Sequence, residues 1–401
     1  GYKMELKLDI FQTMALVTVV FYLGTYLRKK VRFLSKYCIP APVVGGLLFA
    51  LVMLIFKVTN LGTIIIDTTL QNLFMTTFFA SVGFTASFKI LKSGGIKVAI
   101  FLGVAVLLVI SQDIVGATLA KVFNLNPLLG LCTGSISMIG GHGTAGSFGP
   151  LLEELGVNGA TTVSFASATF GLVMGSFIGG FVAKNLIENY KLKTPKESKD
   201  HSIPLSDFHE DNQVVLCQNR LMKGSSFLFL SMGIGSIISG LIQGTGLTFP
   251  SYIGAMIAAA IIRNFCDIRK LEIEEKEIEV IGNISLSYFL CIALMGLRLW
   301  ELFDLALPMV FMLIAQALLM GFFAYFITFR IMGKDYDAAV FASANCGFGM
   351  GATPNAVANM DALTVKFGYA PTPYLVVPIV GCLFIDFVNT AVLTLFINIL
   401  R

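Results

Sequence analysis

Residues 126–150 read NPLLGLCTGSISMIGGHGTAGSFGP, a glycine-rich stretch inside a chain of long apolar runs. Glycine costs about 1 kcal/mol per residue in a helix interior, so the run Ile139–Thr144 is expected to break a helix. A broken backbone at membrane depth is tolerated only where protein buries it or where it lines a watery cavity. The stretch therefore predicts a re-entrant hairpin: a short helix in, a glycine-rich tip and a short helix out.

A second stretch of this kind spans residues 336–360 and reads YDAAVFASANCGFGMGATPNAVANM. Gly347, Gly349, Gly351 and Pro354 are expected to interrupt its helix in the same way. Two broken segments at corresponding places in the two halves of a chain are typical of the binding site of a secondary transporter.

The composition is that of an all-α polytopic membrane protein. Of 401 residues, 56% are hydrophobic and only 13% are charged, and the mean hydropathy is +0.82. A soluble domain carries about 25% charged residues. The apolar runs are continuous, which excludes a β-barrel, because barrel strands alternate. The seven cysteines show no metal-site spacing. We therefore expect the lipid bilayer as a partner, no nucleic acid, no cofactor and no metal beyond a transported ion.

The apolar runs predict five spanning helices in each half of the chain. Residues 1–190 form the first half and residues 224–401 the second, joined by a polar linker, residues 191–223, whose His201 and His209 are expected at the surface. The predicted spans are Ile10–Leu27, Ala41–Phe56, Leu70–Phe88, Ile96–Val122, Ala160–Ile187, Gly224–Gln243, Phe249–Phe265, Ile281–Leu297, Phe303–Phe329 and Pro373–Leu400.

The two halves look like repeats. The sequence PVVGG at residues 42–46 opens the second helix, and PSYIG at residues 250–254 opens the seventh. An odd number of spans per half turns the second copy upside down, which predicts two inverted repeats, each with one re-entrant hairpin. We interpret Gly171, Gly175 and Gly179 as a helix-packing face, because small residues at this spacing let helices approach closely.

The distribution of basic residues predicts the orientation. With the N-terminus outside, 22 of the 28 lysines and arginines lie on the cytoplasmic side, where such residues concentrate. Both termini are then periplasmic and the linker is cytoplasmic. The two hairpins enter from opposite faces and are each long enough to reach the midplane, so their tips are expected to meet there.

The tips are expected to bind an anion through backbone N–H groups and the positive ends of the outgoing helices. No lysine or arginine lies in either hairpin. The predicted substrate-binding residues are Ser137, Gly141, His142, Gly143, Thr144, Gly349, Gly351, Ala352, Thr353 and Asn355.

A cation is expected beside these tips, because helix-end carbonyls and neutral oxygens suit Na⁺. Asp386 is the sharpest candidate, since a carboxylate deep in the last helix is costly unless it has a partner. It would ligate Na⁺, meet a substrate ammonium or carry a proton. Asp113 also lies in an apolar run, beside Gln112. The predicted Na⁺ ligands are Asp386, Asn389, Asn345 and Ser135.

Several motifs resemble the bacterial sodium/glutamate symporter family. They are IPAPVVGGLL at 39–48, GGHGT at 140–144, ATFGLV at 168–173, ALMGL at 293–297, MGKDYDAAV at 332–340 and CGFGMGATP at 346–354. The resemblance runs nearly end to end. It implies Na⁺-driven uptake of L-glutamate across the bacterial inner membrane, ten helices with two re-entrant loops, and a homodimer with a fixed scaffold and a sliding, elevator-type transport domain.

Two alternatives are weighed against this reading. One is a Na⁺- or H⁺-coupled carrier of a di- or tricarboxylate of the hydroxycarboxylate type. The other is a channel, which needs a continuous polar pore, whereas the polar residues here gather at the two tips. An enzyme is not expected, because the sequence shows no nucleophile, base and orienting group that would act together.

Overall fold

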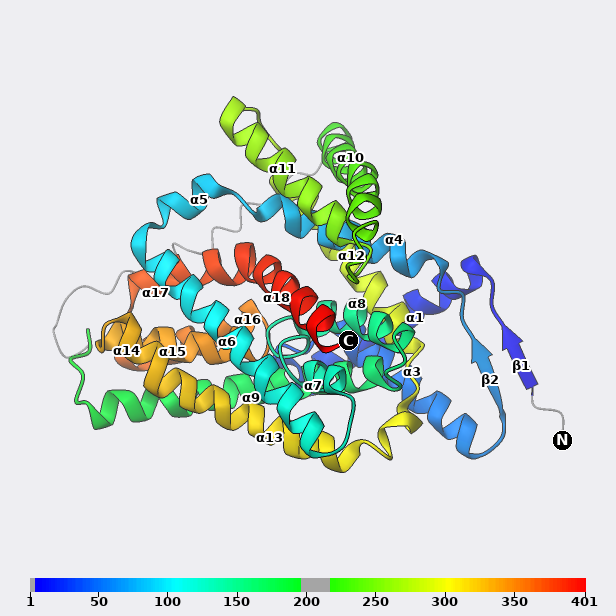
Figure 1. Ribbon diagram of the computed structural model, residues 1–401, viewed down its shortest axis with the longest axis horizontal. Coiled ribbons are helices and arrows are strands. Elements are labelled where there is room, and N and C mark those ends of the chain that lie inside the picture. Colours follow the sequence, from blue (N-terminus) through cyan, green and yellow to red (C-terminus); the bar gives the residue numbers. More distant parts are fainter. Residues whose placement is uncertain (1–3, 196–216) are drawn as a thin grey trace.

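The computed structural model describes residues 4–195 and 217–401, and this part of the chain is almost entirely helical (Figure 1). His201, His209 and residues 196–216 of the predicted linker lie outside the described residues. The elements of the first half are β1 (Met4–Lys7), α1 (Ile10–Lys30), α2 (Arg32–Lys36), α3 (Ala41–Val58), β2 (Gly62–Ile65), α4 (Thr69–Thr85), α5 (Phe88–Ser93), α6 (Gly95–Val122), α7 (Pro127–Thr133), α8 (Gly141–Glu154) and α9 (Ala160–Asn189).

The second half also consists mainly of long helices, with one short 3₁₀ helix and two short π-helical segments. Its elements are α10 (Gln218–Gln243), α11 (Ile253–Arg269), α12 (Glu275–Met295), η2 (Leu299–Leu302), α13 (Ala306–Phe322), η3 (Phe323–Thr328), α14 (Phe329–Met332), α15 (Tyr336–Gly349), α16 (Thr353–Phe367), α17 (Pro371–Pro378), η4 (Ile379–Phe384) and α18 (Ile385–Leu400).

Each of the ten predicted spans overlaps a helix of the structure. Seven helices among the described residues are long and apolar enough to cross a membrane, and an eighth span results if the pair Pro371–Gly381 and Ile385–Leu400, bent by 45°, counts as one. The other two predicted spans correspond to α4 and α11, which have 17 residues each and are not among the seven. The structure therefore supports a multi-pass helical protein, and ten spans stay a prediction.

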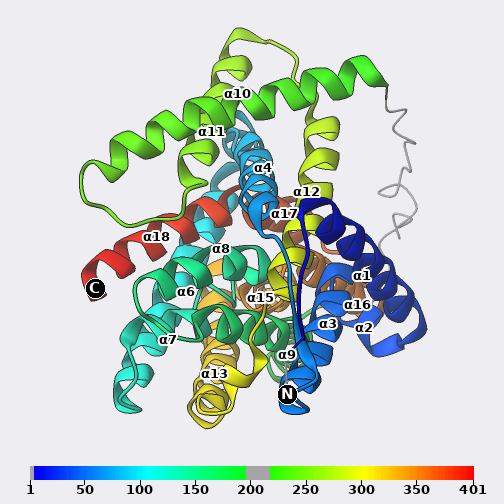
Figure 2. The same ribbon diagram turned by 90° about the vertical axis from the view of Figure 1, so that its right-hand side faces the viewer.

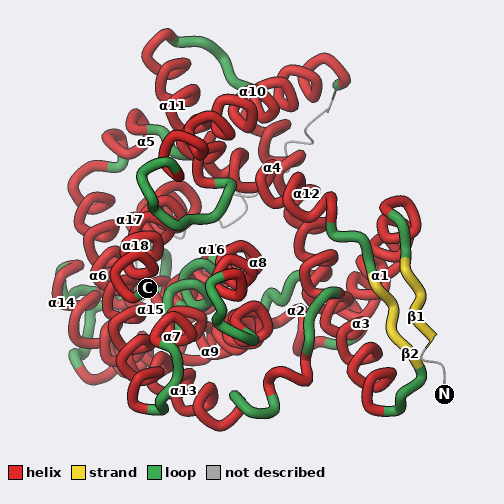
Figure 3. Tube along the Cα trace, turned by 45° about the vertical axis from the view of Figure 1, so that its right-hand side comes forward, coloured by secondary structure: helices red, strands yellow, loops and turns green. Residues whose placement is uncertain are grey.

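A small sheet departs from the all-helical expectation. β1 and β2 pair in parallel, with Met4 opposite Gly62 and Lys7 opposite Ile65 (Figure 3). α1, α2 and α3 lie between the two strands in the sequence, so the chain returns to pair with its first strand after three helices. α1 itself begins at a capping box in which Asp9 and Gln12 exchange side-chain and backbone hydrogen bonds.

The helices pack as two groups, each drawn from both halves of the chain. The first group comprises α1, α3, α4, α10, α11 and α12, in which α12 packs on α3 and α4, and α11 packs on α4 and α10. The second group comprises α6 to α9, α13 and α15 to α18, in which α9 packs on α7, α8, α13, α15 and α16. In Figure 2, α10 and α11 lie at the top, and the second group lies mostly below and to the left of α4 and α12.

Glycines allow the closest helix contacts in both groups. A Cβ atom at Gly45 of α3 would lie 2.1 Å from the Val20 carbonyl oxygen of α1, and one at Gly254 of α11 would lie 2.0 Å from the Gly235 carbonyl oxygen of α10. The predicted packing face of α9 is confirmed: Cβ atoms at Gly171, Gly175 and Gly179 would each lie within 2.7 Å of an atom of α15, the following Met350 or α16. Any larger residue at these positions needs the helices to separate.

Both predicted hairpin stretches form two helices with a break between them, and each break coincides only in part with the predicted one. In the first, the break covers residues 134–140, and the GGHGT run opens α8 rather than interrupting it. In the second, α15 continues through Gly347 and the break falls at residues 350–352. Tertiary packing overrides the low helix propensity of glycine here: a Cβ at Gly347 would lie 2.5 Å from the backbone of Ala356.

Side-chain caps fix where the two incoming helices begin. The Asn126 side chain accepts a hydrogen bond from the Leu128 amide, and Pro127 occupies the first turn of α7. The Asp335 side chain accepts from the Ala338 amide at the start of α15. The outgoing helices α8 and α16 have no side-chain cap, so their first amides remain open to a ligand.

Candidate functional site

A cavity of about 610 Å³ lies where the two helix breaks meet. Residues 139–144 line it from the first break and the start of α8, and residues 351–355 line it from the second break and the start of α16. α4, α11, α12 and α18 close the remaining sides, so both helix groups contribute to the wall. Eight of the ten predicted substrate-binding residues line this cavity: Gly141, His142, Gly143, Thr144, Gly351, Ala352, Thr353 and Asn355.

The two tips are in direct contact. Gly141 has φ +59°, and a Cβ atom there would lie 3.2 Å from the carbonyl oxygen of Gly351. A residue with a side chain would be strained in this left-handed conformation and would press on the facing tip. Glycine at this position therefore sets the distance between the tips.

Backbone amides at both tips point to an anion site. Within the described residues, the N–H groups of His142 and Gly143 in α8 and of Gly351, Ala352 and Thr353 before α16 have no hydrogen-bond acceptor. Both helices are long enough to carry a dipole whose positive end faces the cavity. The cavity can therefore hold a carboxylate without a cationic side chain from either tip.

The His142 side chain bonds α9 at one ring nitrogen. Its Nε2 atom lies 3.1 Å from the hydroxyl oxygen of Thr169. Because the Thr169 hydroxyl donates its own proton to the Phe165 carbonyl oxygen, Nε2 of His142 acts as the donor to Thr169. The hydrogen bond ties the tip of α8 to α9.

Asp386 supplies a negative charge to the same cavity. It lies in the first turn of α18 and, within the part of the chain that the structure describes, has no hydrogen bond or ion pair. Arg263 also lines the cavity, but its guanidinium bonds Asp267 and Glu275. Glu279 lines the cavity as well and has no ion pair among the described residues, but its side chain is exposed, whereas Asp386 is partly buried. The Asp386 carboxylate therefore suits a positively charged ligand group.

Two predicted substrate residues lie outside the cavity lining. The Ser137 hydroxyl donates to the carbonyl oxygens of Cys132 and Ser164 and so holds the break of the first hairpin stretch. The Gly349 carbonyl oxygen accepts from Gln112 Nε2 at 2.7 Å, and a Cβ atom at Gly349 would lie 2.8 Å from the Leu108 side chain and 2.9 Å from Met320 Sδ. Both residues position the tips without facing the cavity.

The remaining predicted cation ligands are fully buried and also lie outside the cavity lining. Ser135 donates to Asp113, Asn389 Nδ2 donates to the Ser135 carbonyl oxygen, and Asn345 Nδ2 donates to the Thr328 hydroxyl. Ser135 and Asn389 lie together, whereas Asn345 lies on α15 beside η3. Among the described residues, no group of three or more His, Cys, Asp or Glu side chains is arranged to hold a metal ion.

Sequence reasoning did not place Asn283, Glu275 and Glu279 of α12 at the site, although they line the cavity. Glu275 and Glu279 precede the predicted span Ile281–Leu297, where charged residues usually mark only the membrane surface. The one sequence feature that could have pointed to Asn283 is its polar amide side chain within an apolar helix. Which face of α12 meets the tips depends on tertiary packing and is not readable from the sequence.

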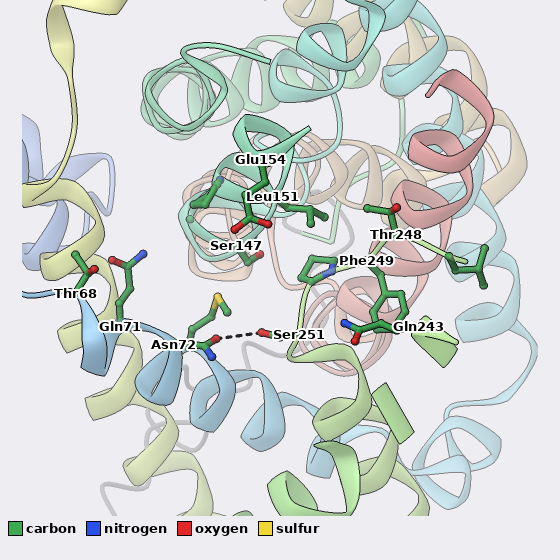
Figure 4. Close-up of a pocket in the computed structure, with 15 residues that line it drawn as sticks. Thr68, Gln71, Asn72, Ser147, Leu151, Glu154, Gln243, Thr248, Phe249 and Ser251 are labelled. Atoms are coloured by element: carbon green, nitrogen blue, oxygen red, sulfur yellow. Dashed lines mark hydrogen bonds between the residues drawn. The ribbon is translucent and has the colours of Figure 1, made fainter. Parts of the chain in front are cut away.

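A second cavity, of about 580 Å³, lies at the opposite end of α4 (Figure 4). Thr68, Gln71 and Asn72 line it from the start of α4, while residues of the C-terminal end of α4 line the first cavity. Ser251 donates to Asn72 Oδ1 at 3.0 Å across it. α8 separates the two cavities, since its first turn lines one and its later turns line the other.

A stacked aromatic pair lies where the first helix group contacts α18 of the second. The rings of Phe79 in α4 and Tyr252 before α11 stack with centroids 3.7 Å apart, and the Tyr252 hydroxyl lies 3.4 Å from that of Thr390 in α18. Phe79 and Tyr252 are both fully buried. The Tyr252 hydroxyl therefore joins the stacked pair of the first group to α18 of the second.

Comparison with known proteins decides the family. The sodium/glutamate symporter family matches residues 6–369. The chain belongs to this family.

Similar proteins cover nearly the whole chain. The sodium/glutamate symporter of Escherichia coli (strain K12) is 41% identical over 393 residues, which span 97% of this chain and 98% of that protein. The sodium/glutamate symporter of Haemophilus influenzae is 37% identical and covers 97% of both chains. A solved sodium proton antiporter from Methanocaldococcus jannaschii aligns over 98% of both chains with 16% identity and a TM-score of 0.37, which is too low to inform the fold.

The positions of the two cavities predict their access in this symporter-family chain. In a variant whose seven native cysteines are replaced, cysteines introduced at Glu279 and Thr353 should react with a charged, membrane-impermeant maleimide from one side of the membrane. A cysteine at Glu154 should react from the other side, because Glu154 lines the second cavity. Labelling of right-side-out and inside-out vesicles measures this, and labelling of Glu279→Cys and Glu154→Cys from the same side would contradict it.

Proposed function

We propose that the protein is a Na⁺-coupled symporter that takes up L-glutamate across the bacterial inner membrane by alternating access of the cavity between the two tips. Family membership carries the proposal, because the matching relatives are named sodium/glutamate symporters. The cavity adds a chemical argument: it combines open backbone amides with the unpaired Asp386 carboxylate, and these groups are complementary to an anionic amino acid.

The substrate carboxylates are proposed to bind the tip amides. The N–H groups of His142, Gly143, Ala352 and Thr353 lie on the two facing tips and offer donors from two directions. Hydrogen bonds from preorganised amides to a carboxylate are charge-assisted and stronger than neutral ones. Asn355 adds a side chain whose Nδ2 is held by Leu172 and whose Oδ1 has no donor within the described residues.

The substrate ammonium is proposed to face Asp386. The sequence placed this residue among the Na⁺ ligands, but it lines the same cavity as the tip amides, where an amino acid presents its ammonium beside its carboxylate. Ser135, Asn345 and Asn389 stay the proposed Na⁺ ligands. The Oδ1 atoms of both asparagines are buried and have no donor among the described residues, which suits a hard cation.

The hydroxycarboxylate carrier is the alternative. It would share the open amides, but its substrate has no ammonium to balance Asp386. The unpaired carboxylate in the cavity therefore favours an amino acid over a di- or tricarboxylate.

The architecture is proposed to be two inverted repeats, residues 1–190 and 224–401, joined by the linker 191–223. The support is that α1 with α3 and α10 with α11 are corresponding helix pairs, and each pair crosses at glycines. The second helix group, which carries both tips, is proposed to slide past the first in an elevator motion, and the first group to form the homodimer contact. Few contacts join the groups away from α8 and α12, which is what sliding requires.

The termini are proposed to be periplasmic and the linker cytoplasmic, on the support of the basic-residue distribution. The cavity that the tips line reaches Glu275 and Glu279 at the start of α12, which then lies on the cytoplasmic side. The described conformation is accordingly one in which the site faces the cytoplasm.

Transport assays test the function directly. In proteoliposomes, an inward Na⁺ gradient should drive uptake of labelled L-glutamate, whereas an equal K⁺ gradient or a pH gradient without Na⁺ should not. Unlabelled L-glutamate should compete and citrate should not. Uptake of citrate, or glutamate uptake driven by protons alone, would favour the alternative carrier.

Gly141→Ala is expected to reduce glutamate uptake at least about tenfold. The added methyl group meets the Gly351 carbonyl oxygen, and a left-handed residue with a Cβ costs about 1–2 kcal/mol. Gly156→Ala is the matched control, because Gly156 also has a positive φ, of +88°, but has open space around it. Equal loss of uptake in both variants, at equal membrane expression, would assign the effect of Gly141 to backbone strain alone.

Asp386→Asn is expected to raise the KM for glutamate by about 10- to 100-fold, because a hydrogen bond to a charged group contributes about 1.5–3 kcal/mol. The Na⁺ concentration for half-maximal uptake should stay the same. Asp361→Asn is the control, since Asp361 is a carboxylate of the same helix group that bonds Tyr374 outside the cavity. An unchanged KM with an altered Na⁺ dependence would make Asp386 a Na⁺ ligand instead.

A further inference from the structure

A second intramembrane carboxylate lies behind the first tip, outside the cavity lining. Asp113 of α6 is fully buried, and the Ser135 amide and hydroxyl donate to its Oδ1 and Oδ2 atoms, each at 2.9 Å. Within residues 4–195 and 217–401, no lysine, arginine or histidine forms an ion pair with it. A buried carboxylate is costly without a compensating positive charge, and two neutral donors compensate only part of it.

Two buried side-chain amides bond the backbone of Ser135 and Gln112, the residues that adjoin this carboxylate. Asn389 Nδ2 donates to the Ser135 carbonyl oxygen at 3.2 Å, and Gln316 Nε2 donates to the Gln112 carbonyl oxygen at 2.8 Å. Because each nitrogen is committed to a carbonyl, the orientation of both amides is fixed. Their oxygens, Asn389 Oδ1 and Gln316 Oε1, have no hydrogen-bond donor among the described residues.

The backbone adds further oxygens at the same place. A Cβ atom built on Gly134 would have three oxygens as its nearest neighbours: Asp113 Oδ1 at 2.9 Å, the Gln112 carbonyl at 3.0 Å and the Gly130 carbonyl at 3.3 Å. Within the described residues, the cluster therefore has more acceptors than donors, and no basic side chain balances the Asp113 carboxyl group. Such a set of hard oxygens matches a small cation and not a second anion.

We propose that Asp113, with Ser135 and Asn389, binds the coupling Na⁺, and that Asp113 supplies the charge of this site. The inference rests on the proposed function. It adds Asp113, which is absent from the Na⁺ ligands predicted from the sequence. One carboxylate with neutral oxygens balances a monovalent ion, as Na⁺ requires. Ser135 lies in the same helix break whose far end, Gly141, touches the second tip, so an ion bound here fixes the break on which the substrate amides depend.

Na⁺ binding to the purified full-length protein without glutamate tests the site. The thermal unfolding midpoint should rise with NaCl at constant ionic strength, with choline chloride as the replacement salt, because a ligand that binds only the folded state stabilises it. Asp113→Asn keeps the size and the hydrogen-bond acceptor of the side chain but removes the charge. It should abolish the Na⁺-dependent rise or shift its half-effect concentration at least about tenfold, which corresponds to about 1.4 kcal/mol. Asp386→Asn, the same change at the cavity carboxylate, should keep the half-effect concentration.

A second pair of variants keeps the test decisive if Asp113→Asn does not fold. Asn389→Ala should also shift the half-effect Na⁺ concentration upward. Asn359→Ala is its matched control, because Asn359 is likewise a buried asparagine whose Nδ2 bonds backbone carbonyls, of Gly175 and Ser343, outside the cluster. Asn359→Ala should lower the midpoint without changing its Na⁺ dependence. Equal Na⁺ dependence in Asn389→Ala, Asn359→Ala and the unaltered protein would overturn the proposal and leave Asp113 as a protonated structural group.

Glutamate uptake by the same proteins distinguishes a wrong Na⁺ site from a wrong proposed function. If the unaltered protein takes up glutamate with Na⁺ and Asp113→Asn does so with the same Na⁺ dependence, the site is wrong and the proposed function stands. If the unaltered protein does not take up glutamate, yet Na⁺ stabilises it and Asp113→Asn loses this effect, the site stands and the substrate assignment fails.

Discussion

Backbone N–H and C=O groups inside a membrane need partners, and the rest of this structure depends on how two helix breaks meet that requirement. Each break leaves amides at the start of an outgoing helix, and the structure turns these amides toward a shared cavity instead of toward lipid. The carbonyls at the incoming ends are occupied by side chains such as Ser137, Gln112 and Asn389. The backbone N–H groups at the tips thus remain open, where an anionic substrate can bind them. The backbone carbonyl oxygens of the incoming helix ends, in contrast, accept hydrogen bonds from side chains of the protein.

Close approach of backbones is the second requirement, and α9 provides it. Its glycine face lets the second tip pack directly on the helix, so that the Met350 carbonyl oxygen lies where a side chain of residue 171 would be. The first tip is tied to the same helix through His142 and Thr169. One long helix therefore holds both tips in register, and this explains why they belong to one packing group although they come from opposite halves of the chain.

The two intramembrane aspartates differ in what surrounds them. Asp386 faces the cavity beside the tip amides, where a ligand from either aqueous side can reach it once the site opens. Asp113 is sealed behind the first tip, among serine, glutamine and asparagine side chains and backbone carbonyls. Exposure to a cavity suits the exchangeable ammonium of a substrate, and enclosure by oxygens suits a dehydrated ion. A shared helix break gives the two sites a physical connection.

The sequence by itself determined the multi-pass helical class, the existence of two broken segments and their place at the site, because hydropathy and glycine content act locally along the chain. It also led to the family through its motifs. It placed the breaks correctly only in part, since residues 141–144 and Gly347 are helical, while Gly140 and Gly351 lie in the breaks. Only the tertiary structure decided that Ser137 and Gly349 hold the tips from outside, that α12 contributes a wall, and that Asp113 lies beside Ser135 and Asn389. These outcomes depend on contacts between residues far apart in the chain, and local sequence does not reveal which oxygen of one helix faces which charge of another.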